Sequence, residues 1–238
     1  MRSLAPADLL AAWERASTAA PTSRALVVLA AAEDETSHQP LLDLPIGEID
    51  ARLLELRALL VGRDVEATSA CPSCAEEVEL EFAIDDIRAE QSDERIHVKK
   101  SGYEVWCRSP TARDLETLGT HADPARSLLA HCIERAEYKH KPVSASKLPR
   151  AVLSALDEAL ERANAQADVV LSLTCPACGS AWGAPFDAGA FLWDEVDARA
   201  VALLLEVDAL ARAYGWREPE ILALSPQRRA CYLDLVLA

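Results

Sequence analysis

Hydrophobic residues recur through the last part of the chain at the three- and four-residue spacings of an amphipathic helix. Residues 188–214 form the longest such stretch, one face of which would carry Leu192, Val196, Leu203, Val207, Leu210 and Tyr214. Gly215 predicts a left-handed cap that ends this helix. Ser225 and Pro226 predict the start of a last helix, with serine as its cap. We therefore expect residues 188–238 to be a C-terminal helical segment.

Prolines mark the expected starts of further helices upstream. Proline is favoured in the first helical turn, because the N–H group that it lacks would have no partner there. The prolines placed in this way are Pro6, Pro21, Pro45, Pro110, Pro124 and Pro149. Most of the chain is therefore expected to be helical.

Two stretches predict strands instead. Residues 77–84 alternate between polar and apolar side chains, which is typical of a strand with one face in water. The segment RIHVKKSGYEVWCR predicts a β-hairpin that turns at Ser101–Gly102. An acidic surface linker over residues 85–95 would precede this hairpin, which we expect to project from one half of the chain only, as a candidate contact element.

Composition and charge exclude several classes of function. Half of the 238 residues are hydrophobic, so the chain is expected to fold around a core. Acidic residues outnumber Lys and Arg by 39 to 24, and the net charge of −15 disfavours nucleic-acid binding. No apolar run reaches the ~20 residues of a membrane helix, and acids interrupt the N-terminal apolar stretch. We expect no membrane partner and a cytoplasmic location.

Cysteine supplies the clearest candidate chemistry. Four of the seven cysteines form two Cys-Pro-x-Cys pairs, namely Cys71, Cys74, Cys175 and Cys178. Such a turn presents two thiolates, which is half of a tetrahedral zinc site. The other three cysteines, Cys107, Cys132 and Cys231, lie among apolar neighbours, and we interpret them as small core residues whose roles are open.

The two cysteine pairs belong to a longer internal repeat. Cys71, Cys74 and Phe82 each have an identical residue 104 positions later. Leu44–Pro45 likewise corresponds to Leu148–Pro149. These fixed offsets indicate a duplication. The predicted domains are residues 1–90, a first helical and knuckle repeat; 91–187, a second repeat with the inserted hairpin; and 188–238.

The predicted fold is α+β and mostly helical, with two repeated halves joined by a zinc-ribbon-like pair of knuckle hairpins. The four cysteines would hold one Zn²⁺ per chain. Four thiolates leave no open coordination position, so this site would be structural. The alternative is that each pair is a redox Cys-x-x-Cys motif or a knuckle without metal.

The sequence contains no established catalytic motif. Neither a phosphate loop, a nucleophile elbow nor a zinc-protease helix motif occurs. The five histidines are widely spaced, and no pair of groups demands acid–base chemistry. We expect a protein that is not an enzyme and has no small-molecule substrate.

The C-terminal segment offers candidate anchors for a partner protein. Trp216 follows the expected helix cap, Tyr232 lies on the last helix, and Trp193 extends the apolar stripe of residues 188–214. Large aromatic residues are frequent anchors of interfaces. The alternative is that this segment packs only on the core of its own chain.

The same segment resembles a known family. The elements CPACG, FLWDEVDARA, EVDALARAYGW, EILALSP and RRACYLDLV are similar to the C-terminal signature of baseplate and tail-assembly proteins. Those proteins are encoded with contractile phage tails and phage-tail-like contractile injection systems. The first half, with CPSC before VELEFAIDD, is also similar. One departure is Asp208, where the family pattern would have histidine.

The resemblance implies a non-enzymatic part related to the baseplate hub of T-even phages. We expect a structural or assembly component of a contractile tail-like particle, whose partners are other baseplate and tail proteins. The alternative is a cytoplasmic chaperone or adaptor that holds a tail protein and does not remain in the particle.

Overall fold

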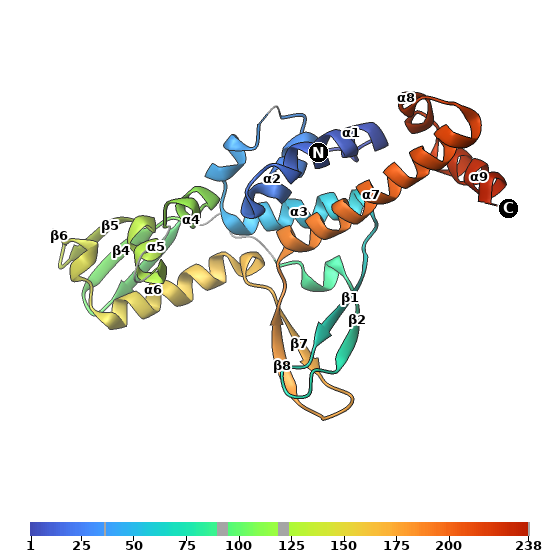
Figure 1. Ribbon diagram of the computed structural model, residues 1–238. Coiled ribbons are helices and arrows are strands. Elements are labelled where there is room, and N and C mark those ends of the chain that lie inside the picture. The colour runs from blue at the N-terminus through green and yellow to red at the C-terminus, as the bar shows by residue number, and fades with distance from the viewer. Residues whose placement is uncertain (36, 90–94, 119–123, 238) are drawn as a thin grey trace. The chain divides into compact units, whose positions relative to one another are not determined.

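The computed structural model describes residues 1–35, 37–89, 95–118 and 124–237. The fold is α+β and mostly helical, as predicted (Figure 1). Contacts divide the chain into two compact units. Unit 1 comprises Met1–His38, Leu53–Gly62 and Asp187–Ala238, and unit 2 comprises Gln39–Arg52 and Arg63–Phe186. The units are discontinuous in sequence, whereas the domains predicted from the repeat are contiguous, and those repeat boundaries stay a prediction.

Unit 1 is helical. Its elements are α1 (Pro6–Ser17), α2 (Arg24–Ala32), the C-terminal part of α3 (Ile46–Leu60), α7 (Ala188–Tyr214), α8 (Glu218–Leu222) and α9 (Pro226–Leu237). Both α1 and α2 pack against α7, and α8 and α9 contact it as well. The buried core includes Leu10, Val28, Leu29, Leu56, Leu192, Val196, Leu203, Leu210 and Ile221. One long helix therefore supports most of this unit.

The predicted ends of α7 are confirmed. The Asp187 side chain caps the helix by accepting a hydrogen bond from the Ala190 N–H at 2.9 Å. Gly215 ends the helix at a φ of 69°, and its N–H donates to the Ala211 carbonyl at 2.9 Å. Along the described parts of the chain, no helix is long and apolar enough to cross a membrane.

Polar residues of α7 form hydrogen bonds with other helices of unit 1. Glu195 accepts hydrogen bonds from the buried guanidinium of Arg57, the nearest at 2.8 Å. Asp197 accepts from the Trp13 indole N–H at 2.6 Å. Two acidic residues of the FLWDEVDARA motif, Glu195 and Asp197, therefore serve packing in this unit, because each satisfies a donor contributed by another helix.

A second buried arginine joins α9 to α7. Arg229 is 1% exposed, and its guanidinium pairs with the carboxylate of Glu206. It also donates to the Leu224 carbonyl at 3.4 Å. Because a guanidinium is costly to bury without partners, these contacts fix how the last helix lies on α7.

Unit 2 contains two hairpins and a four-stranded sheet. One hairpin is β1 (Asp64–Ala70) with β2 (Glu77–Ala83), and the other is β7 (Val170–Thr174) with β8 (Ala181–Pro185). The antiparallel sheet has the order β3 (Ile96–Lys100), β4 (Tyr103–Cys107), β5 (Ile133–Tyr138) and β6 (Lys141–Pro142). The unit also contains α4 (Ala112–Leu118), α5 (Pro124–Cys132), α6 (Arg150–Ala163) and the N-terminal part of α3.

The sheet packs on α6 through its own core. That core contains Ile96, Val105, Cys107, Leu129, Cys132, Ala136, Leu148, Val152 and Leu156. The interpretation of Cys107 and Cys132 as core residues is confirmed. It is wrong for Cys231, which is exposed on α9, because the apolar neighbours of Cys231 along a helix lie on other faces.

The predicted hairpin over residues 96–107 is confirmed as β3–β4, but it is part of a larger sheet, and its role as a contact element stays a prediction. Its turn at Ser101–Gly102 is present, with φ values of 53° and 79°, but β5 pairs with β4 and β6 extends the sheet. Pairing satisfies the backbone groups along β4 and lets Val105 and Ala136 share one buried layer. The second half therefore carries a whole sheet, and β5 and β6 lie between its second and third helices.

We predict that the buried arginine pair matters far more than an exposed one. Arg229→Ala should lower the free energy of unfolding by about 3 kcal/mol, because the substitution leaves partners of the cation unpaired in a buried place. The matched control is Arg212→Ala. Arg212 pairs with Asp208 on α7 at 2.8 Å but is 80% exposed, so its loss should cost no more than about 0.5 kcal/mol. Denaturant unfolding measures both, and equal costs would contradict this account.

Candidate metal centre

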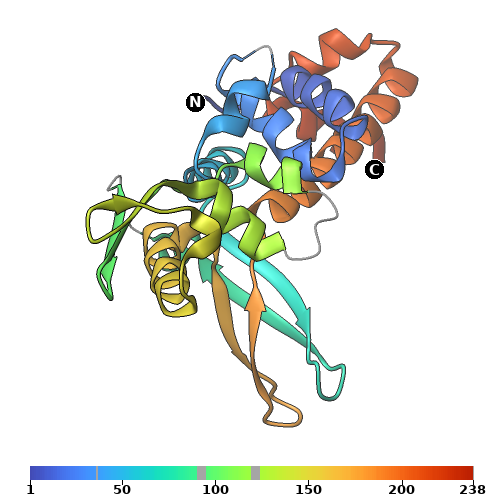
Figure 2. The same ribbon diagram turned by 90° about the vertical axis from the view of Figure 1, so that its left-hand side faces the viewer.

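The two Cys-Pro-x-Cys pairs form the tips of the two hairpins, which lie side by side in Figure 2. Each tip closes with the same two backbone hydrogen bonds. In the first, Cys71 N–H donates to the Glu76 carbonyl at 2.8 Å, and Ala75 N–H donates to the Cys71 carbonyl at 2.9 Å. In the second, the corresponding bonds are Cys175 to Ser180 at 2.9 Å and Gly179 to Cys175 at 3.0 Å.

The residue after each cysteine pair adopts a left-handed backbone. Gly179 has a φ of 73°, which glycine adopts without steric cost. Ala75 has a φ of 61° at the equivalent place, where its Cβ makes the conformation unfavourable by about 1 kcal/mol or more. The first knuckle therefore keeps the geometry of the second despite the less suitable residue.

The four sulfur atoms converge at one point. All lie within 4.8 Å of one another, with Cys71 and Cys175 buried and Cys74 and Cys178 exposed. The Cys71–Cys178 separation is 3.7 Å and the Cys74–Cys175 separation is 3.6 Å. A tetrahedron with metal–sulfur bonds of about 2.3 Å has edges of about 3.8 Å. The sulfur positions therefore fit a four-coordinate metal ion.

Hydrogen bonding within the cluster shifts the pKa values of Cys71 and Cys74 in opposite directions. Burial opposes the charged form of Cys71, but the backbone N–H groups of Ser73 and Cys74 and the neighbouring thiols outweigh it and lower the pKa of Cys71 to about 7. For Cys74, a backbone hydrogen bond at Glu76 favours the thiolate, but the thiols of Cys178 and Cys175 raise its pKa to about 12. The two thiols of the first knuckle therefore differ in how readily they lose a proton.

Contacts beside the cysteines also join the two hairpins. The Ser73 and Ser180 hydroxyls lie 2.9 Å apart. Phe82 and Phe186 meet edge to face, with ring centroids 5.8 Å apart. The serine contact was not predicted, since Ser73 and Ser180 do not occupy equivalent positions in the repeat. The phenylalanine contact joins two residues that the repeat does relate.

The structure does not bring the three candidate partner residues together. Trp216 and Tyr232 belong to one aromatic cluster with Tyr214, in which the Trp216–Tyr232 centroid distance is 4.9 Å. Trp193 lies near the other end of α7, about 30 Å away along the helix axis, and the guanidinium of Arg24 lies over its ring at 5.1 Å. All three indole or phenol rings are partly buried. Their role in partner binding stays a prediction.

The structure thus defines an α+β protein in which two hairpins bring four cysteines together at a candidate metal site. The model of the family described as T4 bacteriophage base plate protein matches residues 27–184. The chain belongs to this family. Comparisons with curated proteins and with solved structures give no match. The matched range contains all four cysteines, whereas most of the C-terminal motifs that carry the sequence resemblance lie beyond it.

Proposed function

We propose that this protein is a non-enzymatic structural or assembly component of the baseplate of a contractile tail-like particle. The observation that carries the proposal is the family match over residues 27–184, about two thirds of the chain. Its partners are other baseplate and tail proteins of a phage tail or a contractile injection system. The producing cell's cytoplasm is the place of synthesis and assembly.

The metal in this proposal is one structural Zn²⁺ per chain. The donor set supports zinc, because four thiolates at tetrahedral spacing favour Zn²⁺ over the hard cations that prefer oxygen ligands. The Cys71–Cys178 and Cys74–Cys175 sulfur contacts, at 3.7 Å and 3.6 Å, each join one hairpin to the other. A redox Cys-x-x-Cys motif would instead pair the two sulfurs of one turn, so the cross-hairpin arrangement favours the metal.

Duplication of a helical and knuckle unit accounts for the internal symmetry of this site. Strand pairing in the two hairpins has one register, since Ala70 faces Glu77 and, 104 positions later, Thr174 faces Ala181. The cross-hairpin sulfur contacts exchange under the same shift, because Cys71–Cys178 becomes Cys175–Cys74. These equivalences support two halves related by a pseudo-twofold axis through the metal in a zinc-ribbon-like centre.

A tail-assembly chaperone that leaves before the particle is complete is the second candidate function. The net charge of −15 favours it as much as it favours a retained component, since an acidic protein can cover a basic surface of a partner. In both cases binding to other proteins, rather than catalysis, is the activity.

The zinc proposal predicts one metal ion per folded chain. Cys71→Ser and Cys175→Ser should each abolish metal binding and lower the melting temperature to the same extent, because each removes one ligand of a single tetrahedron. Cys231→Ser is the matched control: this cysteine is exposed and outside the cluster, so both metal content and melting temperature should be unchanged. Elemental analysis and thermal melts measure these quantities. Absence of metal in the wild type, or two ions per chain, would contradict the single site.

Purified particles should contain the protein together with sheath and tube. The measurement is quantitative mass spectrometry of particles from a producing strain that carries the wild-type chain, with the Cys71→Ser chain as a comparison. Retention in stoichiometric amounts would support the structural component. The chaperone would be supported if wild-type particles lack the protein and if a strain without its gene forms no particles.

Trp216 and Tyr232 are predicted to anchor a baseplate partner. Trp216→Ala should then abolish pull-down of neighbouring baseplate proteins while the isolated chain keeps most of its stability. The control is Leu210→Ala, which truncates a fully buried residue of α7 and should cost about 3–5 kcal/mol of stability. A Trp216→Ala chain that melts as early as the control, with partner binding retained in its folded fraction, would assign Trp216 to the core.

A further inference from the structure

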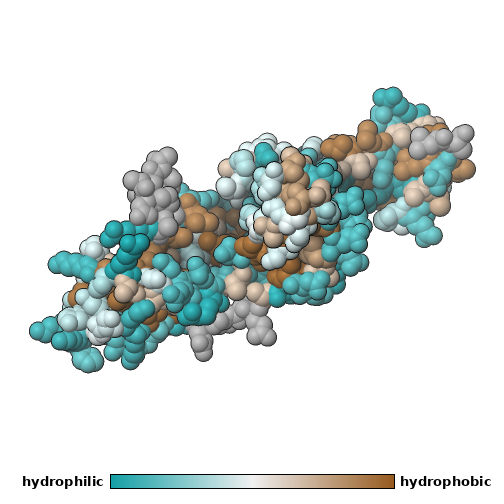
Figure 3. Space-filling view, turned by 90° about the horizontal axis from the view of Figure 1, so that it is seen from below, coloured by the Kyte–Doolittle hydropathy of each residue, from teal (hydrophilic) through white to brown (hydrophobic). Residues whose placement is uncertain are grey.

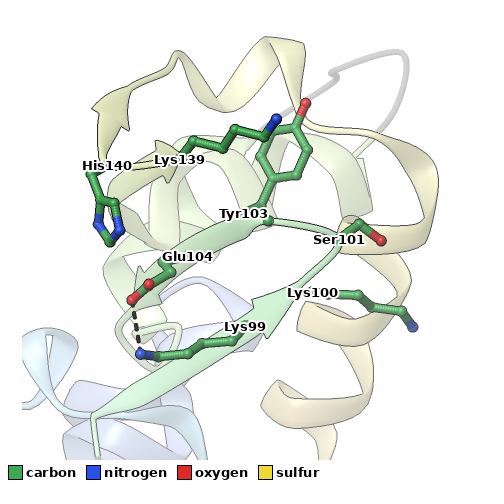
Figure 4. Close-up of a pocket in the computed structure, with 8 residues that line it drawn as sticks. Lys99, Lys100, Ser101, Tyr103, Glu104, Lys139 and His140 are labelled. Carbon is green, nitrogen blue, oxygen red and sulfur yellow. Dashed lines mark ion pairs between the residues drawn. The ribbon is translucent and has the colours of Figure 1, made fainter.

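Every lysine of the chain lies in one short part of the sequence. The five lysines are Lys99, Lys100, Lys139, Lys141 and Lys147. The first four lie at one end of the four-stranded sheet, where the turns of β3–β4 and β5–β6 meet around a hollow of about 510 Å³ (Figure 4). We call Lys99, Lys100, Lys139, His140 and Lys141 the basic turn end. The surface that lies over this end of the sheet is largely hydrophilic in Figure 3.

The basic turn end is only partly neutralised by its own chain. Lys99 pairs with Glu104 at 3.0 Å, and the Lys139 ammonium lies 5.3 Å from the centroid of Tyr138. Lys100 points away from the Lys99–Glu104 pair in Figure 4. Among the described residues, neither Lys100 nor Lys141 forms an ion pair. Two exposed cations are thus available at this end of a chain whose net charge is −15.

One face of the β1–β2 hairpin has the opposite character. Alternation along the strands places Glu66, Glu77, Glu79 and Glu81 on its exposed side, which we call the acidic hairpin face. Glu66 lies directly opposite Glu81 across the two strands, and like charges in that position are destabilising. Within the described ranges, none of these four glutamates forms an ion pair. A cationic surface bound there would relieve the repulsion.

Protection of sheet edges gives a simpler explanation of some of the lysines. β3 and β6 are the two edge strands, and lysine on an edge strand discourages pairing with another chain. That role accounts for Lys99 and Lys100 on β3 and for Lys141 on β6. It gives no reason for Lys139 and His140, which form a turn with positive φ values of 47° and 64°.

We propose that the basic turn end of one copy docks on the acidic hairpin face of a second copy. The two surfaces are complementary in charge, and each is exposed and incompletely neutralised within its own chain. Because they are different patches, the contact is head-to-tail and generates a ring or an open filament. At physiological ionic strength, charges farther apart than about 8 Å are largely screened from each other. The attraction between the two docked surfaces therefore outweighs the repulsion between the other, acidic parts of the two copies.

The test reverses the charge of each surface in the full-length chain. One variant carries Lys100→Glu with Lys141→Glu, and the other carries Glu77→Lys with Glu79→Lys. None of these side chains has an ion-pair partner among the described residues, so both variants should fold, which circular dichroism checks. The matched control is Lys147→Glu, which reverses the one lysine outside the basic turn end.

In sedimentation velocity, the wild type and the control should show a sedimentation coefficient that rises with concentration. Each double variant alone should stay at the monomer value. An equimolar mixture of the two variants should associate again, because the acidic turn end of one then matches the basic hairpin of the other.

Four results would overturn the proposal. These are a wild type that remains monomeric, a mixture that fails to associate, a control that loses association with the variants, and association that persists in Lys100→Glu with Lys141→Glu. The last result would leave edge protection as the role of these lysines. Binding of duplex DNA by the wild type but not by that variant would assign the basic turn end to nucleic acid instead.

Discussion

The convergence of four cysteine sulfurs is the constraint on which the arrangement of the two hairpins depends. Among the residues of β1, β2, β7 and β8, Val65 alone is buried. A two-stranded hairpin with so little apolar burial is marginally stable in water. Its partner hairpin is equally poor in core, and the Phe82–Phe186 contact is small. Coordination of a cation, as proposed for this cluster, would therefore be coupled to the meeting of the hairpins as one equilibrium.

The same constraint acts on everything between the cysteine pairs. A metal cross-link between Cys71–Cys74 and Cys175–Cys178 would close a loop of about 100 residues and lower the conformational entropy of the unfolded chain, an effect on the order of 4–5 kcal/mol. That loop contains the four-stranded sheet and α4 to α6. The sheet has its own core and could form without the metal. The hairpins, in contrast, have no comparable core, so loss of the cation would act first on them.

Local signals in the sequence were sufficient for most elements but not for their pairing. Proline starts and the Gly215 cap located helices because both act within one turn. The β5–β6 hairpin was missed because its turn uses Lys139 and His140 at positive φ, where Asn-Gly is the usual signal. The cysteine cluster was predicted because two cysteines separated by two residues are a typical pair of metal ligands. The Arg57–Glu195 pair joins residues 138 positions apart, and no local pattern indicates it.

Arginine and lysine have separate uses in this chain. Arginine supplies the paired structural cations, as in the contacts of Arg57 with Glu195, Arg108 with Asp114 and Arg229 with Glu206. Its planar guanidinium offers several donors at once, which suits partly buried carboxylates. Lysine is a compact, strongly hydrated charge that is more useful at an exposed surface. Because lysine is restricted to one part of the chain, the end of the four-stranded sheet gathers four of the five lysines of an otherwise acidic protein.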